Sequence, residues 1–370
     1  MRHSILFLLF ILFTTPSFAN CNADEQVGFR SYNFRIENDY FNNEDSNYTS
    51  GVILSGVTHD FKGDVRNECL PVISRLHGRL LSFMDDELFK KKEGSSKNIY
   101  FTGSQLMYTP VDDKTPSVIK DDRPYAGILS LAVGVNERHR NQFDGTQVLN
   151  TKELTLGIIG PASFARQTQN FVHDRFNVYR AAGWNNQLSN EPAAMLLIEK
   201  KIKSDLQQNS YTHGISKDLI RFYGLRVGNI ETSLNLGLEG RYGLNIPNDF
   251  GSTPSYPGCD NTAPSSGSSE TCTDKGELML PIPLGAHLFA LAELKAVAYD
   301  FSLDGNIFAN NHHVHKEPFV CLIAVGLNSL IPIPGNKNLK LTLTQYIQSK
   351  EFKEQKTADK YVSFTVGLDF

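Results

Sequence analysis

Alternation of apolar and polar residues recurs along most of this chain and constrains its fold more than any other feature. The clearest stretch is SLNLGLEGRYGLN, at 233–245. One parity holds leucine and tyrosine and the other holds polar or charged residues: Leu234, Leu236, Leu238, Tyr242 and Leu244 against Asn235, Glu239 and Arg241. A period of two indicates β-strands, which a soluble β-sandwich also contains. The charge on the polar parity favours instead an antiparallel barrel with a wet interior and a lipid-facing wall.

The final segment of the chain also favours a membrane barrel. YVSFTVGLDF, at 361–370, alternates again and ends in phenylalanine. Its apolar parity consists of Val362, Phe364, Val366, Leu368 and Phe370. An alternating last strand that ends in Phe resembles the C-terminal signature of bacterial outer-membrane barrels. We therefore predict an all-β fold, a transmembrane antiparallel β-barrel with short helices in its loops.

The first residues predict export. MRHSILFLLFILFTTPSFAN has a short basic start, an apolar run and a small-residue site that ends at Ala19. This pattern is typical of a secretory signal peptide at 1–19, which leaves 20–370 as one barrel domain. A lipoprotein anchored through Cys21 is the alternative, although the preceding Asn20 is not the small residue that such a site usually has. Because no apolar run reaches roughly 18 residues, membrane residence requires a barrel.

Charge and cysteine usage exclude several classes of function. The net charge is −4 and no basic run occurs, so we do not expect nucleic acid as a partner. Among the 5 cysteines, Cys259 and Cys272 flank a loop rich in Ser, Gly and Pro. In an exported protein this spacing predicts a local disulfide, and Cys21 with Cys69 is a weaker candidate. No pair has the C-x2-C spacing of a metal site.

The alternating segments predict about twelve strands, an even number as in bacterial single-chain barrels. The expected ranges, accurate to several residues, are 27–38, 49–59, 98–109, 126–136, 151–160, 193–203, 218–228, 232–244, 287–300, 318–327, 339–349 and 361–370. Sustained helical periodicity occurs only around 65–91 and 162–182.

Strand order then divides the connections between two rims. If both termini lie in the periplasm, the outer rim carries 39–48, 110–125, 161–192, 229–231, 301–317 and 350–360. The segments 60–97 and 245–286 fall on the periplasmic side, where turns are usually short. Their length departs from the usual barrel, and the sequence does not indicate their role or the oligomeric state.

Polar residues gather where the first two strands meet the outer rim. Asn38 and Asp39 end the first strand and Thr49 begins the second, so a hairpin makes them neighbours. The carboxylates of Asp39, Glu44 and Asp45 suit a hard cation such as calcium. The segment lacks the EF-hand pattern, however, and a solvated acidic turn is the alternative.

Two further outer connections contain candidate residues. His173 lies on the expected helix of the long connection that also holds the only tryptophan, Trp184, and a neutral imidazole there can act as a general base. A surface or packing role for His173 is the alternative. Arg123 can bind a phosphate bidentately, or it can form an internal ion pair with Asp121 or Asp122.

Other signals favour no site. The tract NNHHVH at 310–315 lacks regular ligand spacing and indicates a polar loop rather than a metal centre. No G-x-S-x-G motif is present, so a serine nucleophile has no support.

Three motifs together resemble the outer-membrane lipid A 3'-O-deacylase family. They are ENDY…YTSG at 37–51, YTP…DDRPYAG at 108–127, and GPAS…Q…H…GW…QL…EP at 160–192. The resemblance spans nearly the whole mature chain. It implies a twelve-stranded barrel that uses calcium to remove the 3'-acyloxyacyl chain of lipid A, or lipopolysaccharide, in the outer leaflet of the bacterial outer membrane.

The resemblance also implies which residues act. Asn38, Asp39, Thr49 and His173 match the family's catalytic positions, with Asp39 as a calcium ligand. Arg123 and Glu191, which lie in the second and third motifs, are weaker candidates for substrate binding. Ser50 stands where Asn or Ala is common and the acidic insert at 42–46 is short, which leaves the other calcium ligands open.

These residues suggest a mechanism and its place. His173 would activate a water, calcium would polarise the ester carbonyl, and Asn38 or Thr49 would donate a hydrogen bond to the oxyanion. By parity, Asn38 shares the lipid-facing side of the first strand with Tyr32, Phe34 and Ile36, whereas Asp39 points inward. A non-catalytic porin-like barrel and a general outer-membrane phospholipase are the alternatives.

Overall fold

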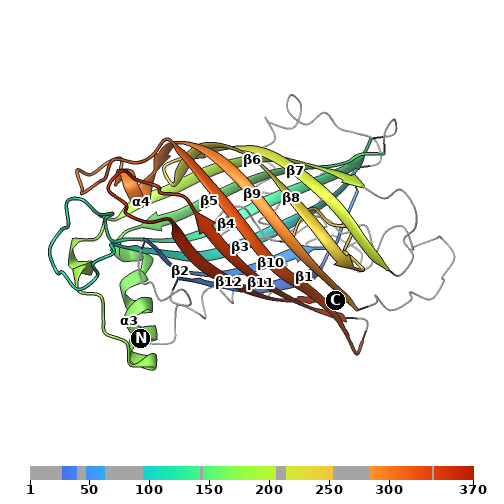
Figure 1. The fold of residues 1–370 in the computed structure, drawn as a ribbon, viewed down its shortest axis with the longest axis horizontal. Coiled ribbons are helices and arrows are strands. Elements are labelled where there is room, and N and C mark those ends of the chain that lie inside the picture. The colour runs from blue at the N-terminus through green and yellow to red at the C-terminus, as the bar shows by residue number, and fades with distance from the viewer. Residues whose placement is uncertain are drawn as a thin grey trace, which may run out of the picture.

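The computed structural model describes residues 27–39, 47–62, 95–141, 145–205, 214–252, 284–335 and 337–370. Twelve antiparallel strands close into a barrel, each paired with its neighbour in sequence and β1 paired with β12 (Figure 1). The strands are β1 (Phe29–Asn38), β2 (Asn47–Thr58), β3 (Ser96–Thr109), β4 (Ala126–Arg140), β5 (Gln147–Ile159), β6 (Glu191–Asp205), β7 (Ile215–Gly228), β8 (Glu231–Leu244), β9 (Gly285–Asp300), β10 (Phe319–Ile333), β11 (Lys337–Gln348) and β12 (Asp359–Asp369). Within these described ranges no helix is long and apolar enough to cross a membrane.

The predicted strand count and order are confirmed. The largest difference is in β10, which was expected to end at 327 and continues to Ile333. Its last residues pair with β11 up to Ile333 and Lys337, so the tight turn that follows, rather than the proline at 332, ends the strand. The leader, the helical periodicity at 65–91 and both candidate disulfides lie outside the described residues. Cys321, on β10, is an exposed free thiol.

The wall separates lipid-facing from interior side chains as the alternation predicts. On β1, Phe34 is 40% exposed while its neighbour Arg35 is 1% exposed. On β8, Leu236 is 59% exposed while Asn235 is buried. β12 closes the barrel with the same parity, since Ile36 pairs with Phe364. Lipid solvates the apolar faces and the barrel interior satisfies the polar ones.

Buried polar and aromatic side chains fill the interior. The Tyr48 hydroxyl donates a hydrogen bond to the Glu37 carboxylate, and Arg35 Nε lies 3.3 Å from the same carboxylate. The rings of Tyr346 and Tyr361 stack with centroids 4.6 Å apart. Such contacts satisfy inward polar groups that would otherwise be costly to bury.

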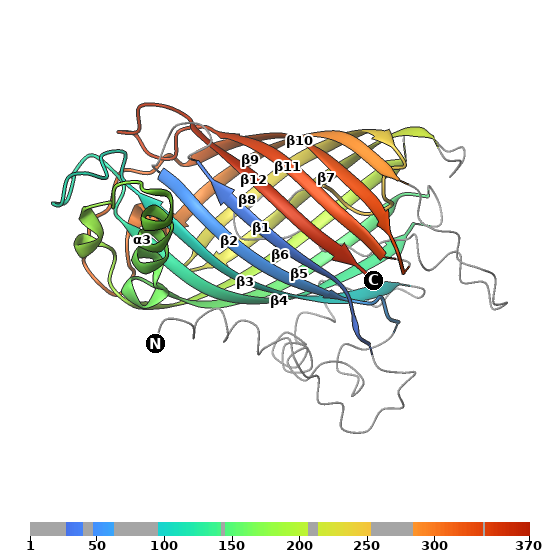
Figure 2. The same ribbon diagram turned by 90° about the horizontal axis from the view of Figure 1, so that it is seen from below.

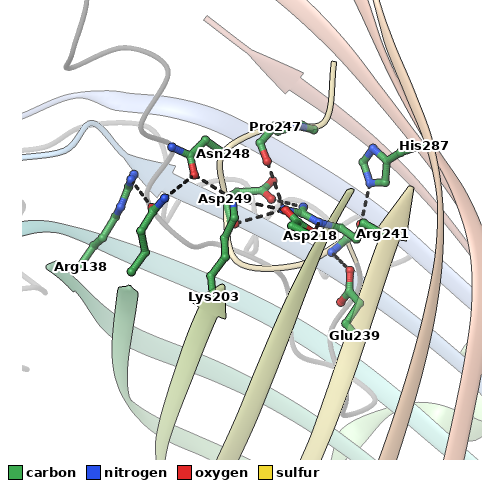
Figure 3. A network of polar contacts seen from close by, with 11 residues as sticks. Arg138, Lys203, Asp218, Glu239, Arg241, Pro247, Asn248, Asp249 and His287 are labelled. Atoms are coloured by element: carbon green, nitrogen blue, oxygen red, sulfur yellow. Dashed lines mark hydrogen bonds and ion pairs between the residues drawn. The ribbon is translucent and has the colours of Figure 1, made fainter. Parts of the chain in front are cut away.

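At the end of the barrel opposite the helices α3 (Ala165–Phe176) and α4 (Phe301–Asp304), the segment 247–252 turns back into the barrel from the end of β8 (Figure 3). Asp249 forms an ion pair with Arg241 of β8. Ser252 Oγ lies 2.7 Å from His287 Nε2 on β9, and Lys203 Nζ of β6 donates to Asn248 Oδ1 at 2.8 Å.

Charge and packing connect this segment to several strands of the barrel. Burial raises the pKa of Asp249, but the positive charges of Arg241, Lys340 and Lys203 outweigh it and hold that pKa below its usual value. These three cations come from three different strands, β8, β11 and β6. Phe250, fully buried, packs on Leu149 of β5. We call residues 247–252 the inner plug.

The inner plug predicts that the barrel conducts no ions. In planar lipid bilayers, wild-type protein is expected to show no steady conductance. The double variant Asp249→Ala/Phe250→Ala removes the central ion pair and the apolar anchor, and is expected to produce stepwise openings. Asp112→Ala, on an exposed outer loop, is the control and should stay silent. Steady conductance by the wild type would contradict a closed lumen.

Candidate active site

Asn38, Asp39 and Thr49 meet at the outer ends of β1 and β2, as the hairpin predicted. Asn38 Nδ2 donates to the Thr49 carbonyl oxygen at 3.2 Å. The Asp39 backbone N–H donates to the same oxygen at 3.4 Å. Asp39 is only 2% exposed, whereas Asn38 is half-buried on the lipid-facing parity. The outward parity of Asn38 on β1 matches the expectation, and Asp39 follows directly after the end of the strand.

A β-bulge places Thr49 on the outside of the barrel. The pairing of β2 with β3 shifts register between Tyr48 and Ser50, which frees Thr49 from the regular alternation. Tyr48 points inward, while Thr49 Oγ1 lies 2.6 Å from Thr109 Oγ1. Thr109 has the opposite parity to the inward Tyr108, so this hydroxyl pair belongs to the lipid-facing side. Sequence reasoning missed Thr109, although the YTP motif contains it.

Helix α3 (Ala165–Phe176) packs against the outer face of the barrel wall. Both views place it at the end of the barrel where β1 ends and β2 begins (Figures 1 and 2). Gly127 of β4 has the lipid-facing parity of the exposed Leu131, and a Cβ at 127 would lie 2.3 Å from Ala165 Cβ. Gln105 Nε2 on β3 donates to the Ser163 carbonyl at 2.5 Å, just before the helix.

Local backbone geometry fixes where α3 begins and ends. It follows the short 3-10 helix η4 (Pro161–Ser163), and Phe164 between them has φ 60°. Asn177 ends it with φ 56°, the left-handed conformation that commonly terminates helices. The helical periodicity predicted at 162–182 is thus confirmed, but as a shorter helix followed by the 3-10 helix η5 (Gly183–Asn186).

One side of α3 is buried against the wall and the adjoining loop. Ala165, Gln169 and His173 follow at intervals of four residues and are all buried. Trp184 Nε1 donates to Gln169 Oε1 at 2.6 Å, and its ring packs beside Tyr125. Trp184 therefore supports the helix, and Gln169, one turn before His173, is a residue that sequence reasoning missed.

His173 is held in one tautomer. Its Nδ1 lies 2.5 Å from the Tyr179 carbonyl oxygen, and because a carbonyl only accepts, Nδ1 must carry the proton. In the neutral ring the lone pair is then on Nε2, which is the form that can act as a general base. His173 is 7% exposed, so the ring is fixed by its surroundings.

Asp113 anchors the segment that orients His173. The Tyr179 hydroxyl donates to the Asp113 carboxylate at 2.5 Å, and the Ala182 N–H donates to the Asp113 carbonyl at 2.8 Å. Burial raises the pKa of Asp113, against the lowering effects of the Tyr179 hydrogen bond and of the Lys114 charge. Nothing in the sequence singled out Asp113 or Tyr179, because the contact joins two loops far apart in the chain.

The two halves of the site share one face of the barrel. Met107, two residues before Thr109 on the same outward parity of β3, belongs to the apolar cluster with Ala165 and Trp184. Thr49 and Thr109 therefore lie on the same outer wall as the first turn of α3. His173 follows two helical turns later on the same helix.

Arg123 and Glu191 lie elsewhere. Arg123 is fully buried and ion-paired with Glu351, with its guanidinium 5.4 Å from the Tyr108 ring centroid. The geometry supports the internal ion pair, but with Glu351 rather than Asp121 or Asp122. The Glu191 carboxylate accepts hydrogen bonds from Asn229 Nδ2 at 2.9 Å and from the Phe308 N–H at 3.0 Å. Both residues tie rim loops together on the inner side of the wall.

Removing Arg123 is expected to destabilise the barrel. Arg123→Ala leaves the buried Glu351 carboxylate without its partner, which typically costs about 3–5 kcal/mol. Urea unfolding of the refolded protein measures the loss. Arg180→Ala is the control, because the Arg180–Asp174 pair is exposed and should leave stability nearly unchanged. Equal stability of the two variants would contradict a structural role for Arg123.

The histidine tract is a polar loop, as predicted. His312 Nε2 lies 2.6 Å from the Asp122 carbonyl, and His315 Nδ1 lies 2.8 Å from Glu354 Oε1. Within the described part of the chain, no group of three or more His, Cys, Asp or Glu side chains is placed to hold a metal ion.

Comparisons with known proteins agree with this architecture. The family model described as "Outer membrane protein LpxR" matches residues 5–370. The solved structure of LpxR from Salmonella typhimurium superimposes with a TM-score of 0.64 at 16% identity, covering 92% of this chain and 100% of that one. The β domain of the Bordetella autotransporter BrkA gives a TM-score of 0.39 at 7% identity, with 92% and 99% of the two chains covered. No curated protein matches the sequence.

The match to the family model runs from residue 5 to residue 370, and the barrel agrees with the Salmonella fold over all of that chain. The family match and the structural match both agree with the lipid-facing wall described above. The chain belongs to the LpxR family of outer membrane proteins.

Proposed function

We propose that this protein is a calcium-dependent lipid A 3'-O-deacylase that removes the 3'-linked acyloxyacyl chain with a water activated by His173. The observation that carries the proposal is the position of His173. Its Nδ1 is held by the Tyr179 carbonyl, and its helix lies on the lipid-facing wall rather than in the lumen. A membrane lipid reaches that wall by lateral diffusion without leaving the bilayer. The resemblance of the three rim motifs supplies the choice of lipid A.

The chain's own groups support water as the nucleophile. Nε2 of His173 accepts the proton of a water as it attacks the ester carbonyl, while the Tyr179 carbonyl stabilises the imidazolium through Nδ1–H. The same proton then passes to the departing alkoxide oxygen. Thr49 is a poorer nucleophile, since its hydroxyl pairs with another hydroxyl, that of Thr109, rather than with a base.

The residues beside Thr49 fit a calcium ion. The Asp39 carboxylate, the Thr49 carbonyl and the hydroxyls of Thr49 and Thr109 are all oxygen donors, which hard cations prefer. Bound there, calcium would polarise the ester carbonyl and stabilise its oxyanion. The Asn38 amide and the Thr49 hydroxyl are placed at the same junction to orient the lipid head. Glu44 and Asp45 lie outside the described residues and remain candidate ligands.

Loss of the Asp39 charge is expected to weaken calcium binding sharply. Asp39→Asn keeps the shape of the side chain, so the hairpin should fold while the calcium concentration for half-maximal activity rises at least about tenfold. Chelation should abolish the activity of the wild type. Asp112→Asn, exposed on a neighbouring loop, is the matched control. Full activity in chelator would remove calcium from the mechanism.

The two alternatives make different predictions. A porin needs an open lumen, which the inner plug argues against. A general phospholipase would use the same lipid-facing site, so it is separated only by substrate. Comparable rates of fatty-acid release from phosphatidylethanolamine and from lipid A would favour the phospholipase.

A further inference from the structure

Helix α3 carries apolar side chains that remain exposed beside the proposed base. Phe176 is 71% exposed and Val172 is 42% exposed. Exposed large apolar groups that cluster on one element mark an interaction surface. Their orientation on the helix decides whether they can contact the barrel wall.

Helical spacing places both on the side of α3 that faces the wall. Val172 follows Ala165 by seven residues, and Phe176 follows Gln169 by seven, so each lies close to the buried row of Ala165, Gln169 and His173. The first half of this side is covered by Met107 and Trp184. Val172 and Phe176, farther along the helix, remain exposed although they have the same orientation.

The surface beyond that turn is continuous with the lipid-facing wall. The helix packs on the outward side of β4, and the same side of that strand exposes Leu131. In an outer-membrane barrel such side chains contact acyl chains. Phe176 is also three residues after His173, which makes the two side chains neighbours on the helix. A lipid whose ester lies at His173 therefore has its hydrocarbon next to Phe176.

We propose that Val172 and Phe176 form an acyl-chain binding surface, which holds the hydrocarbon of the bound substrate between the last turn of α3 and the barrel wall. The inference rests on the proposed function for the identity of the substrate. It assigns to the helix a role in substrate affinity and chain selection besides carrying His173.

Phe171 provides a matched control. It is 73% exposed on the same helix, but it lies two residues before His173, a spacing that directs the two side chains to different sides. Phe171→Ser and Phe176→Ser thus remove the same group from equally exposed positions. Because neither side chain is buried, both variants are expected to fold, as judged by the heat-dependent gel shift of the barrel.

Binding is measured without turnover, in a His173→Gln background, as lipid A retained by the detergent-refolded protein in native mass spectrometry. We expect Phe176→Ser and Val172→Ser to weaken lipid A binding by about tenfold, and Phe171→Ser to change it by less than about twofold. In the active enzyme, Phe176→Ser should raise KM more for long-chain than for short-chain lipid A. Its effect on kcat should be small.

The outcomes separate the surface from the reaction. Equal binding by the Phe171→Ser and Phe176→Ser proteins overturns the inference, even if wild-type protein deacylates lipid A. The predicted difference in binding without any deacylation by the wild type supports the surface and refutes the proposed function. Absence of lipid A binding by the His173→Gln parent overturns both.

Discussion

Replacing His173 by glutamine is expected to lower the rate of lipid A deacylation by about 10²–10⁴-fold. Glutamine keeps a hydrogen-bonding side chain beside the Tyr179 carbonyl but cannot take a proton from water. The barrel should be unaffected, because α3 lies outside the strand ladder. Single-turnover assays with lipid A in mixed micelles measure the loss directly.

Tyr179→Phe is the companion variant. It removes the hydroxyl that donates to Asp113 but keeps the carbonyl that fixes the His173 tautomer. A much smaller decrease is therefore expected than for His173→Gln. If His173→Gln retains wild-type activity in a folded barrel, His173 is not the base.

Introducing a large side chain at Gly127 is expected to abolish activity while the barrel survives. At this position even a Cβ would lie 2.3 Å from Ala165 Cβ and 2.5 Å from Ser163 Oγ, so Gly127→Leu must push α3 off the wall. Displacing a base by about 1 Å can cost about 100-fold in rate. The activity assay and the heat-dependent gel shift together measure the two effects.

Gly240→Leu is the matched control for that substitution. Gly240 lies on β8 between the lipid-facing Leu238 and Tyr242, and a Cβ there would have no atom within 4 Å. Leucine at 240 should leave activity and folding unchanged. Equal activity of the Gly127→Leu and Gly240→Leu proteins would show that the contact between α3 and the wall does not matter for catalysis.

The barrel could be predicted because every strand shows the same alternation of apolar and polar residues. The lipid on one side and the polar interior on the other impose the same alternation on every strand, as in SLNLGLEGRYGLN and YVSFTVGLDF. The meeting of Asn38, Asp39 and Thr49 followed from the hairpin alone. Their chemical roles came from the resemblance and stay predictions.

The remaining features depend on contacts that no local pattern records. The bulge at Thr49 changes the face of one side chain, and an alternating sequence does not specify it. The position of α3 depends on the absent side chain of Gly127, which is only informative once the helix is seen to pack there. A short stretch with helical periodicity predicts a helix but not the wall against which it packs.

Ion pairs between residues far apart in the chain could not be predicted from the sequence either. For Arg123 the sequence suggests Asp121 or Asp122, its neighbours, as the partner, whereas the observed partner Glu351 lies 228 residues away. Barrel closure brings the two rim loops together, and only then does the pair form. The inner plug has the same origin, since Asp249 meets cations from three different strands.

The most direct measurement is mass spectrometry of lipid A after incubation with wild-type, detergent-refolded protein, with calcium and with chelator. The proposal predicts loss of one acyloxyacyl unit, from the 3' position, in calcium and intact lipid A in chelator. Intact lipid A in both, from protein whose gel shift shows a folded barrel, would contradict the deacylase assignment.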